Sequence, residues 1–336
     1  MSGVSTIGLD LAKHVFQVHG SDVSGAVIFR KKLRRDQLLK FFATQPASTI
    51  AMEACASSHH WAREIAKLGH QIRLIAPAYV KPFVQRQKND AADAEAICEA
   101  AQRPTMRFVA IKSEEQQAAS LVLRARDLLV GQRTQIINAI RGHLAEFGIV
   151  VAKGPCHVAK LLNRMVDAPA MAQSILQLLF DQLQSLDEKI DQLDQELASR
   201  VKADTEAKRL MTIPGIGPIA ATALVTLAPA AQAFKNGRDF AAWLGLTPLQ
   251  RSTGGKQKLG TTSRMGERTL RRLLIIGASA AVRWARRRGS SSPWLMNLLN
   301  RKPPMPVTVA LANKMARIVW ALMARGGTYR APSLAN

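Results

Sequence analysis

Cysteine is scarce in this sequence of 336 residues, which contains only Cys55, Cys98 and Cys156. Their odd number and wide spacing exclude a disulfide framework, and no Cys-x-x-Cys pair is present to bind zinc. Such sparse cysteine usage is typical of proteins that work in a reducing compartment. We therefore expect a cytoplasmic location.

Long apolar runs are absent as well. No stretch reaches the roughly 18 uncharged apolar residues of a membrane-spanning helix. Residues 1–14 also lack the basic segment and the apolar run of a secretory signal peptide. We therefore expect no membrane partner.

Acidic residues are few, because 24 Asp and Glu oppose 47 Lys and Arg, which gives a net charge of +23. The hydrophobic fraction of 47% is that of an ordinary folded chain. The imbalance is concentrated in residues 245–336, where 17 lysines and arginines accompany a single acid, Glu267. A basic surplus across a whole prospective domain predicts nucleic-acid binding through phosphates and argues against a typical metabolic enzyme.

The first hundred residues alternate between strand and helix patterns. Three apolar or alternating segments separated by turns predict an antiparallel meander, and two further strands follow, each after a helical segment. This element order is typical of a ribonuclease-H-like α/β fold. The predicted strands are 5–11, 15–20, 26–33, 48–54 and 71–76, and the predicted helices are 36–44, 59–69 and 90–102.

Helices dominate the middle of the chain. Residues 113–147 form one long amphipathic stretch, and a second stretch carries an apolar residue at alternating steps of three and four. That spacing is a heptad seam, typical of a coiled coil. The seam either packs inside its own chain or forms an intermolecular or antiparallel coiled coil. Its members are Leu176, Leu179, Leu183, Leu186, Ile190, Leu193 and Leu197.

Residues 210–227 predict a helix-hairpin-helix, with a tight turn from Pro214 to Gly217 between two apolar helices. Gly215 and Gly217 would let the turn approach a phosphate closely, and the free N–H groups of the next helix would point at it. Such contacts recognise the backbone of DNA or RNA and carry no base specificity. A plain helical hairpin is the alternative.

Downstream of this motif, residues 251–260 are glycine-rich and basic, and we expect a flexible loop there. A helix from about 267 to 287 follows, with arginines on one face and Leu and Ile on another. The cations of both segments are candidates for phosphate contacts. They are Arg251, Lys256, Lys258, Arg264, Arg268, Arg271 and Arg272.

Four carboxylates stand at positions where acids are costly unless they are paired or bind metal. Asp10 and Glu53 each end an apolar strand, and Asp90 and Asp93 share one face of a helix. If they converge, their oxygens would hold two Mg²⁺ ions, with Mn²⁺ as an alternative, for phosphoryl transfer. Alternatively, Asp90 and Asp93 only complement the helix N-terminus, and Asp10 caps a turn.

The motifs, taken together and in order, resemble one family of bacterial insertion-sequence transposases, the DEDD transposases. These are related to the DNA invertase of pilin inversion, and the resemblance spans essentially the whole chain. The segments that carry it are IGLDLAKHVF, AMEAC, KNDAADAEAI, IPGIGPIAA, FAAWLGLTP, STGGKQKLG and SRMGERTLRRLL.

The resemblance implies three parts. Residues 1–150 would be a RuvC-like, ribonuclease-H-like α/β domain that carries the DEDD tetrad. Residues 151–205 would be a helical linker with the coiled coil. Residues 206–336 would be a mainly α-helical transposase domain, containing the helix-hairpin-helix and a nucleophilic serine.

The resemblance also implies activity and partners. Asp10, Glu53, Asp90 and Asp93 fall on the family's tetrad, and the serine would bond covalently to a DNA end. A structured non-coding RNA from the element would guide the enzyme by pairing with donor and target DNA. We expect a homodimer or homotetramer, in the bacterial cytoplasm and on the nucleoid when it acts.

The nucleophile position departs from the better-known branch of the family, where a serine directly precedes a single glycine. Here Thr253 stands at that position, with Ser252 before it. We favour Ser252, because a primary hydroxyl is less hindered, and Thr253 stays an alternative. The neighbouring Arg251, Lys256 and Lys258 would stabilise charge on the phosphorus. The alternative is that the Ser252 hydroxyl has no catalytic role and only belongs to a glycine-rich turn.

Other function classes are weaker. A tyrosine recombinase is disfavoured, because the only tyrosines are Tyr79 and Tyr329. A RuvC-like nuclease or junction resolvase, with water as the nucleophile, is the main rival and would form no covalent adduct with DNA. A non-catalytic architectural protein would have no use for four matched carboxylates.

Overall fold

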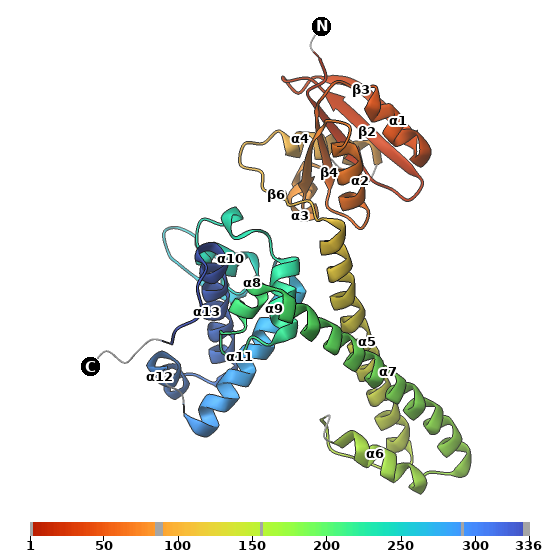
Figure 1. Cartoon of the computed structure of the whole chain (residues 1–336), viewed down its shortest axis with the longest axis vertical. Coiled ribbons are helices and arrows are strands. Elements are labelled where there is room, and N and C mark those ends of the chain that lie inside the picture. The colour runs from red at the N-terminus through yellow and green to blue at the C-terminus, as the bar shows by residue number, and fades with distance from the viewer. Residues whose placement is uncertain (1–2, 85–89, 155–156, 290–291, 332–336) are drawn as a thin grey trace. The chain divides into compact units, whose positions relative to one another are not determined.

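A computed structural model describes residues 3–84, 90–154, 157–289 and 292–331 (Figure 1). The chain divides into two compact units, Met1–Glu114 and Glu115–Asn336. The long helix that follows Glu114 belongs to the second unit. Cys55 is exposed and Cys98 is buried, and neither forms a disulfide. Cys156 lies outside the described residues.

The first unit is built on a six-stranded mixed sheet with the order β3-β2-β1-β4-β5-β6. β1, β2 and β3 form the predicted antiparallel meander, β4 and β5 continue parallel to β1, and β6 is antiparallel to β5. β6 was not predicted. The strands are β1 (Thr6–Asp10), β2 (Val15–Ser21), β3 (Val27–Arg34), β4 (Thr49–Glu53), β5 (Gln71–Ile75) and β6 (Phe108–Val109).

Helices cover both faces of this sheet. On one face, α1 (Leu38–Ala43) and α2 (Ser58–Ala66) bury Phe42 and Trp61 against β1, β2 and β4. On the other face, α3 (Pro77–Val80) and α4 (Asp90–Ala101) pack on β4 and β5. Because β1 lies in the middle of the sheet, its residues are buried on both faces, which explains its unbroken apolar run. These layers are consistent with the predicted ribonuclease-H-like domain.

The second unit contains a 3-10 turn at Met165–Asp167 and another at Ala231–Ala233, and it is otherwise mainly helical. Its one sheet among the described residues is a two-stranded hairpin. Its helices are α5 (Glu114–Glu146), α6 (Val158–Arg164), α7 (Ala170–Ala203), α8 (Thr205–Leu210), α9 (Pro218–Leu227), α10 (Gly237–Trp243), α11 (Arg268–Arg288), α12 (Pro293–Arg301) and α13 (Pro304–Arg325).

The heptad seam lies on α7, which runs antiparallel beside α5 (Figure 1). Near the tip of this pair, Ile140 and Leu144 of α5 pack with Leu176 and Leu183 of α7. Further along, two ion pairs cross between the helices. They join Arg126 to Asp194 and Arg133 to Asp187. Contacts within a single chain therefore bury much of the seam, including Leu186, Ile190 and Leu197.

The core of the second unit gathers α8, α9, α10, α11 and α13 around residues such as Leu224 and Leu274. Helix α13 is long and apolar enough to cross a membrane, which the sequence analysis did not expect. The core helix of a soluble protein passes the same test. Val307, Met315 and Val319 of α13 are buried in the protein, and α13 packs against α10 and α11.

The glycine-rich segment predicted as a flexible loop is the end of a β-hairpin. Strands β7 (Pro248–Gln250) and β8 (Leu259–Thr262) pair antiparallel, and Arg251 N–H donates to the Lys258 carbonyl at 2.8 Å. Gly254 and Gly255 have φ of +56° and +75°, the positive values that both centres of a type I′ turn require. Paired glycines therefore shape a tight turn within the predicted loop, which connects β7 to β8.

Candidate metal centre and basic hairpin

Strand pairing brings the first two acids together. β1 and β4 are parallel neighbours, with Leu9 opposite Met52, so Asp10 and Glu53 end adjacent strands at the same edge of the sheet. Both carboxylates therefore lie at the end of the sheet, where the strands are no longer fully buried. This is the placement expected from the sequence.

Helix α4 supplies the other two acids by packing very close to β1. The contact is at Gly8, where an added Cβ would lie 2.1 Å from the Ala94 carbonyl oxygen and 2.7 Å from the Cys98 nitrogen. Only a residue without a side chain allows this approach. Sequence reasoning missed this role of Gly8, although a glycine inside an apolar strand signals a close backbone contact.

The approach of α4 produces a carboxylate cluster. Oxygens of Asp10, Asp90 and Asp93 lie within 4.8 Å of one another. Asp10 and Asp93 are half-buried, whereas Asp90 is exposed. Glu53 lies outside this cluster but near enough to act electrostatically on Asp10. Three of the four predicted ligands thus meet, with the fourth beside them.

The cluster carries unbalanced negative charge. Burial, followed by the charges of Asp93, Asp90 and Glu53, raises the pKa of Asp10 to about 6, although the Leu11 N–H opposes this. Burial, and then Asp93, also raises the pKa of Glu53. Among the described residues, no lysine or arginine forms an ion pair with any of the four. Clustered carboxylate oxygens that have no cationic ion-pair partner in the described part of the chain suit a hard divalent cation.

The candidate nucleophiles lie on the β7–β8 hairpin. Ser252 and Thr253 are both exposed. The Gln250 side-chain amide donates to Ser252 Oγ at 3.1 Å, whereas Thr253 forms a backbone bridge with Lys256 across the turn. Arg251, Lys256 and Lys258 are exposed beside them. The hairpin therefore presents two hydroxyl-bearing residues and three cations to solvent.

The two glycines of the turn between α8 and α9 have different surroundings. Gly215 has a φ of +90°, and an added Cβ would lie 2.6 Å from the Gly277 carbonyl oxygen on α11. Its bare backbone is therefore required for packing inside the unit. Gly217 precedes α9 as its N-cap and has open space around the Cβ position. Only Gly217 offers the unobstructed approach expected for a phosphate.

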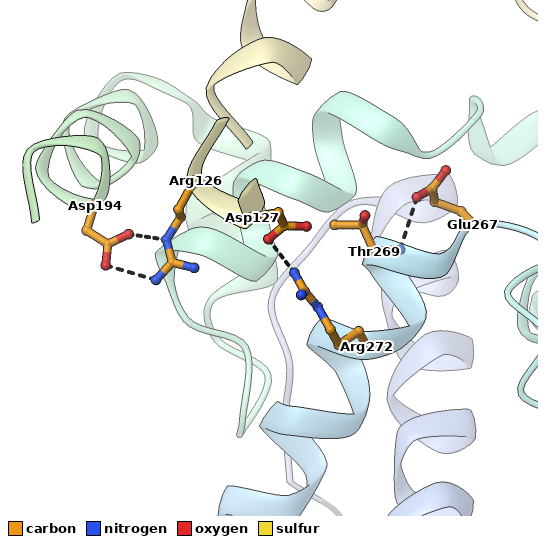
Figure 2. Close-up of polar contacts among 6 residues, drawn as sticks. All are labelled: Arg126, Asp127, Asp194, Glu267, Thr269 and Arg272. Carbon is orange, nitrogen blue, oxygen red and sulfur yellow. Dashed lines mark hydrogen bonds and ion pairs between the residues drawn. The ribbon is translucent and has the colours of Figure 1, made fainter. Parts of the chain in front are cut away.

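Two of the predicted phosphate-binding arginines have partners within the chain. Arg271 donates to the carbonyl oxygens of Leu244 and Met265, at 3.1 and 2.7 Å. Arg272 forms an ion pair with Asp127 of α5 (Figure 2). Arg264 and Arg268 are exposed. The pairing of Arg271 and Arg272 assigns them a structural task that sequence spacing did not reveal.

Glu267, the single acid of the basic C-terminal region, also has a local task. Its carboxylate accepts a hydrogen bond from the Thr269 N–H at 3.1 Å and so caps the start of α11 (Figure 2). A negative group there also complements the helix dipole. Glu267 therefore stabilises the helix end, as an N-cap typically does.

The three-layer first unit is consistent with a ribonuclease-H-like domain, and its carboxylate cluster could hold a divalent metal ion. Known proteins agree with this class of domain. Residues 7–149 match the DEDD transposase domain of the IS110 type, and residues 207–292 match the transposase IS116/IS110/IS902 family.

Relatives that match nearly the whole chain are also named as transposases. A putative transposase y4pF/y4sB of Sinorhizobium fredii is 49% identical over 96% of this chain and 85% of its own length. A probable family 20 transposase of Pseudomonas aeruginosa is 49% identical over 97% of this chain and 99% of its own length. The transposase for insertion sequence element IS1328 of Yersinia enterocolitica is 40% identical over 98% of this chain and 99% of its own length. This chain belongs to the IS110/IS116/IS902 family of insertion-sequence transposases, enzymes that cut DNA and transfer its strands.

Proposed function

We propose that this transposase cuts DNA with a serine nucleophile on the β7–β8 hairpin, assisted by divalent metal at the acidic cluster. The observation that carries the proposal is the convergence of Asp10, Asp90 and Asp93 within 4.8 Å, with Glu53 beside them. Mg²⁺, as two ions, is the proposed metal and Mn²⁺ the alternative, because both are hard cations that take carboxylate oxygens.

The metal's chemical contribution is to stabilise negative charge on the attacking and leaving oxygens of phosphoryl transfer. Asp10, Glu53, Asp90 and Asp93 would hold it through their carboxylate oxygens. Their roles follow from position: Asp10 and Glu53 come from the rigid sheet, while Asp90 and Asp93 come from α4, whose position Gly8 fixes. The cluster is thereby preorganised by the fold.

Ser252 is the proposed nucleophile. The Gln250 amide donates to its Oγ, so the hydroxyl hydrogen points elsewhere and can leave to solvent or a base. The Oγ–P bond forms while the bond from phosphorus to the departing DNA oxygen breaks, and that oxygen takes up a proton. Arg251, Lys256 and Lys258 would stabilise the charge that develops at phosphorus. Thr253 is the alternative nucleophile.

The acids and the hairpin belong to different units, so the proposed active site is composite, within one chain or between chains. We propose that it closes only when donor DNA, target DNA and a structured guide RNA are bound, which prevents random cutting. A homodimer or homotetramer is proposed as the active assembly, in the bacterial cytoplasm and associated with the nucleoid. Gly217, Arg251, Lys256, Lys258, Arg264 and Arg268 are the proposed phosphate contacts.

The experiment is a search for a covalent adduct on a nicked suicide DNA substrate after denaturation. Ser252→Ala should abolish the adduct, and Thr253→Ala, the matched control one residue away, should retain it. The reverse pattern would assign the chemistry to Thr253. Adduct formation in both variants would refute a hydroxyl at this hairpin. Cleavage without any adduct would favour a RuvC-like nuclease that uses water.

A guide RNA is tested separately, by sequencing the RNA that co-purifies with the protein. The proposal expects one enriched structured RNA from the element's own flank. A random sample of cellular RNA would contradict guidance and leave only the general affinity of a basic protein for polyanions.

A further inference from the structure

A large groove in the second unit lies outside the metal centre and the hairpin tip. It follows α13 and is bounded by the start of α10, by β8 and by residues 328–330, with a volume of about 1530 Å³. Pockets for small molecules measure roughly 300–1,000 Å³. The α13 groove, as we call it, is therefore large enough for a segment of a polymer.

The charge of the α13 groove is of one sign. No Asp or Glu belongs to its described lining. A surface of this kind attracts a polyanion and is costly to leave without counter-ions. The basic lining residues are Arg238, Arg264, Lys314, Arg317, Arg325 and Arg330.

Three aromatic rings are interleaved with these cations. Trp294 is 38% exposed, and the Lys314 ammonium lies 4.3 Å from its ring centroid. Trp320 is fixed by its indole N–H, which donates to the Ala231 carbonyl at 3.0 Å. Tyr329 is held at its main chain, because its N–H donates to Thr212 Oγ at 2.9 Å. The groove thus combines flat rings in set positions with neighbouring positive charge.

This combination distinguishes a single strand from a duplex. A single strand offers phosphates to the cations and unstacked base faces to the rings, and each stacked base adds binding energy. Bases inside a duplex are already stacked on one another and present phosphates only. The chemistry of the lining therefore fits an unpaired polynucleotide strand.

The position of the groove indicates which strand it binds. Gly260, Thr261 and Thr262 line the groove, and they belong to β8, which pairs with the strand that leads to Ser252. A strand in the groove would therefore run toward the hairpin that carries the proposed nucleophile, Ser252. We propose that the α13 groove binds single-stranded DNA next to the cleavage hairpin. The choice of DNA rests on the proposed function of the hairpin, whereas the fit of the groove to a single strand rests on its own cations and aromatic rings.

The first test measures binding of a fluorescent 12-nucleotide oligo-dT to the full chain, freed of co-purifying nucleic acid and kept in EDTA. Trp294→Leu should weaken binding about tenfold, the effect of one lost base–ring stack. Trp294→Phe keeps an aromatic face and should stay within about threefold of wild type. A Trp294→Leu protein that binds as tightly as wild type would overturn the proposal.

A matched control uses the same chemistry elsewhere. Trp284 of α11 is 60% exposed and has the Arg288 guanidinium 4.6 Å from its ring, yet it does not line the groove. Trp284→Leu should bind like wild type. An equal loss in both variants would show diffuse binding to a basic surface and would refute the groove.

Charge and strand type give independent measures. Lys314→Gln with Arg317→Gln should reduce the slope of log affinity against log salt by about 1.4, or about 0.7 for each lost phosphate contact on a single strand. An unchanged slope contradicts the proposal. Unlabelled single-stranded DNA should compete better than duplex DNA or RNA of equal length, and stronger competition by duplex or RNA would overturn the assignment. Ser252→Ala should bind normally, which separates failure of the chemistry from failure of the groove.

Discussion

At the scale of single residues, Asp10 connects protonation, metal binding and stability. Its pKa of about 6 in the folded chain exceeds the ordinary value of 3.8, so its ionised form is disfavoured by folding. This destabilisation is fully present above pH 6 and disappears as pH falls toward 4. Metal between the carboxylates would remove it at neutral pH.

We expect metal-free Asp10→Asn to be more stable than wild type at pH 7.5 by about 1 kcal/mol, since the half-exposed site is partly screened by solvent. That corresponds to a rise in Tm of about 2–4 °C, which should shrink at pH 5. Added Mg²⁺ should raise the Tm of wild type but not of the variant at pH 7.5. Equal Mg²⁺ stabilisation of both proteins would argue against a metal site at Asp10.

Gly8 is the residue that the metal centre needs most for its geometry. Because a Cβ there would overlap the backbone of α4, Gly8→Ala should cost about 1–3 kcal/mol of stability and displace Asp90 and Asp93 from Asp10. The Mg²⁺-induced rise in Tm should therefore vanish. Gly3→Ala, where nothing lies within 4 Å, is the control and should change neither quantity. Normal Mg²⁺ stabilisation in Gly8→Ala would show that α4 adapts without loss of the site.

The residue scale also shows what the sequence could predict. Asp10 and Glu53 were predictable because a carboxylate that ends an apolar strand is conspicuous in one dimension. The pairing of Arg272 with Asp127 was not, because the two lie 145 residues apart and only folding brings them together. Local spacing therefore drew attention to the acids but could not show that Arg271 and Arg272 have partners within the chain.

At the scale of elements, the length of a strand and the period of its apolar pattern decided whether the sequence predicted it. The five longer strands have enough residues for an apolar pattern, and the structure contains all five. β6 has two residues and β7 three, too few for a pattern to form. The Gly254–Gly255 pair was nevertheless a usable signal, because Gly-Gly between two short runs is typical of a hairpin turn. The heptad pattern of α7 left its partner open, and α5 fills that place in this chain.

The α5–α7 pair carries a prediction of its own. Leu186 is 2% exposed on the seam, whereas Leu178 on the same helix is 64% exposed. Leu186→Ala should lower the free energy of unfolding by about 2–5 kcal/mol, because it leaves a cavity between packed helices. Leu178→Ala should cost less than about 0.5 kcal/mol in the same denaturant titration. Similar losses in both would mean that another chain covers the outer face of α7.

At the scale of the whole molecule, the net charge of +23 predicts affinity for nucleic acid. It does not identify the cations that make the contacts. The composition counts every arginine equally, but in the folded chain some arginines form ion pairs with acids and others do not. Arg272 and Lys258 are both exposed, but Arg272 forms an ion pair with Asp127 of α5, whereas among the described residues no ion pair involves Lys258. The net charge thus overstates the number of groups that are ready to replace counter-ions on DNA.

This difference predicts unequal salt dependence for two substitutions that change net charge equally. A cation bound to a phosphate releases counter-ions from duplex DNA, and its loss lowers the slope of log affinity against log salt by about 0.9. Lys258→Gln should show that full reduction in duplex DNA binding measured between 50 and about 200 mM salt. Arg272→Gln should reduce the slope less, because the ion pair with Asp127 competes with a phosphate contact of Arg272. A full reduction in Arg272→Gln would mean that DNA displaces Asp127, and the contact between α5 and α11 would then be broken when the transposase binds its substrate.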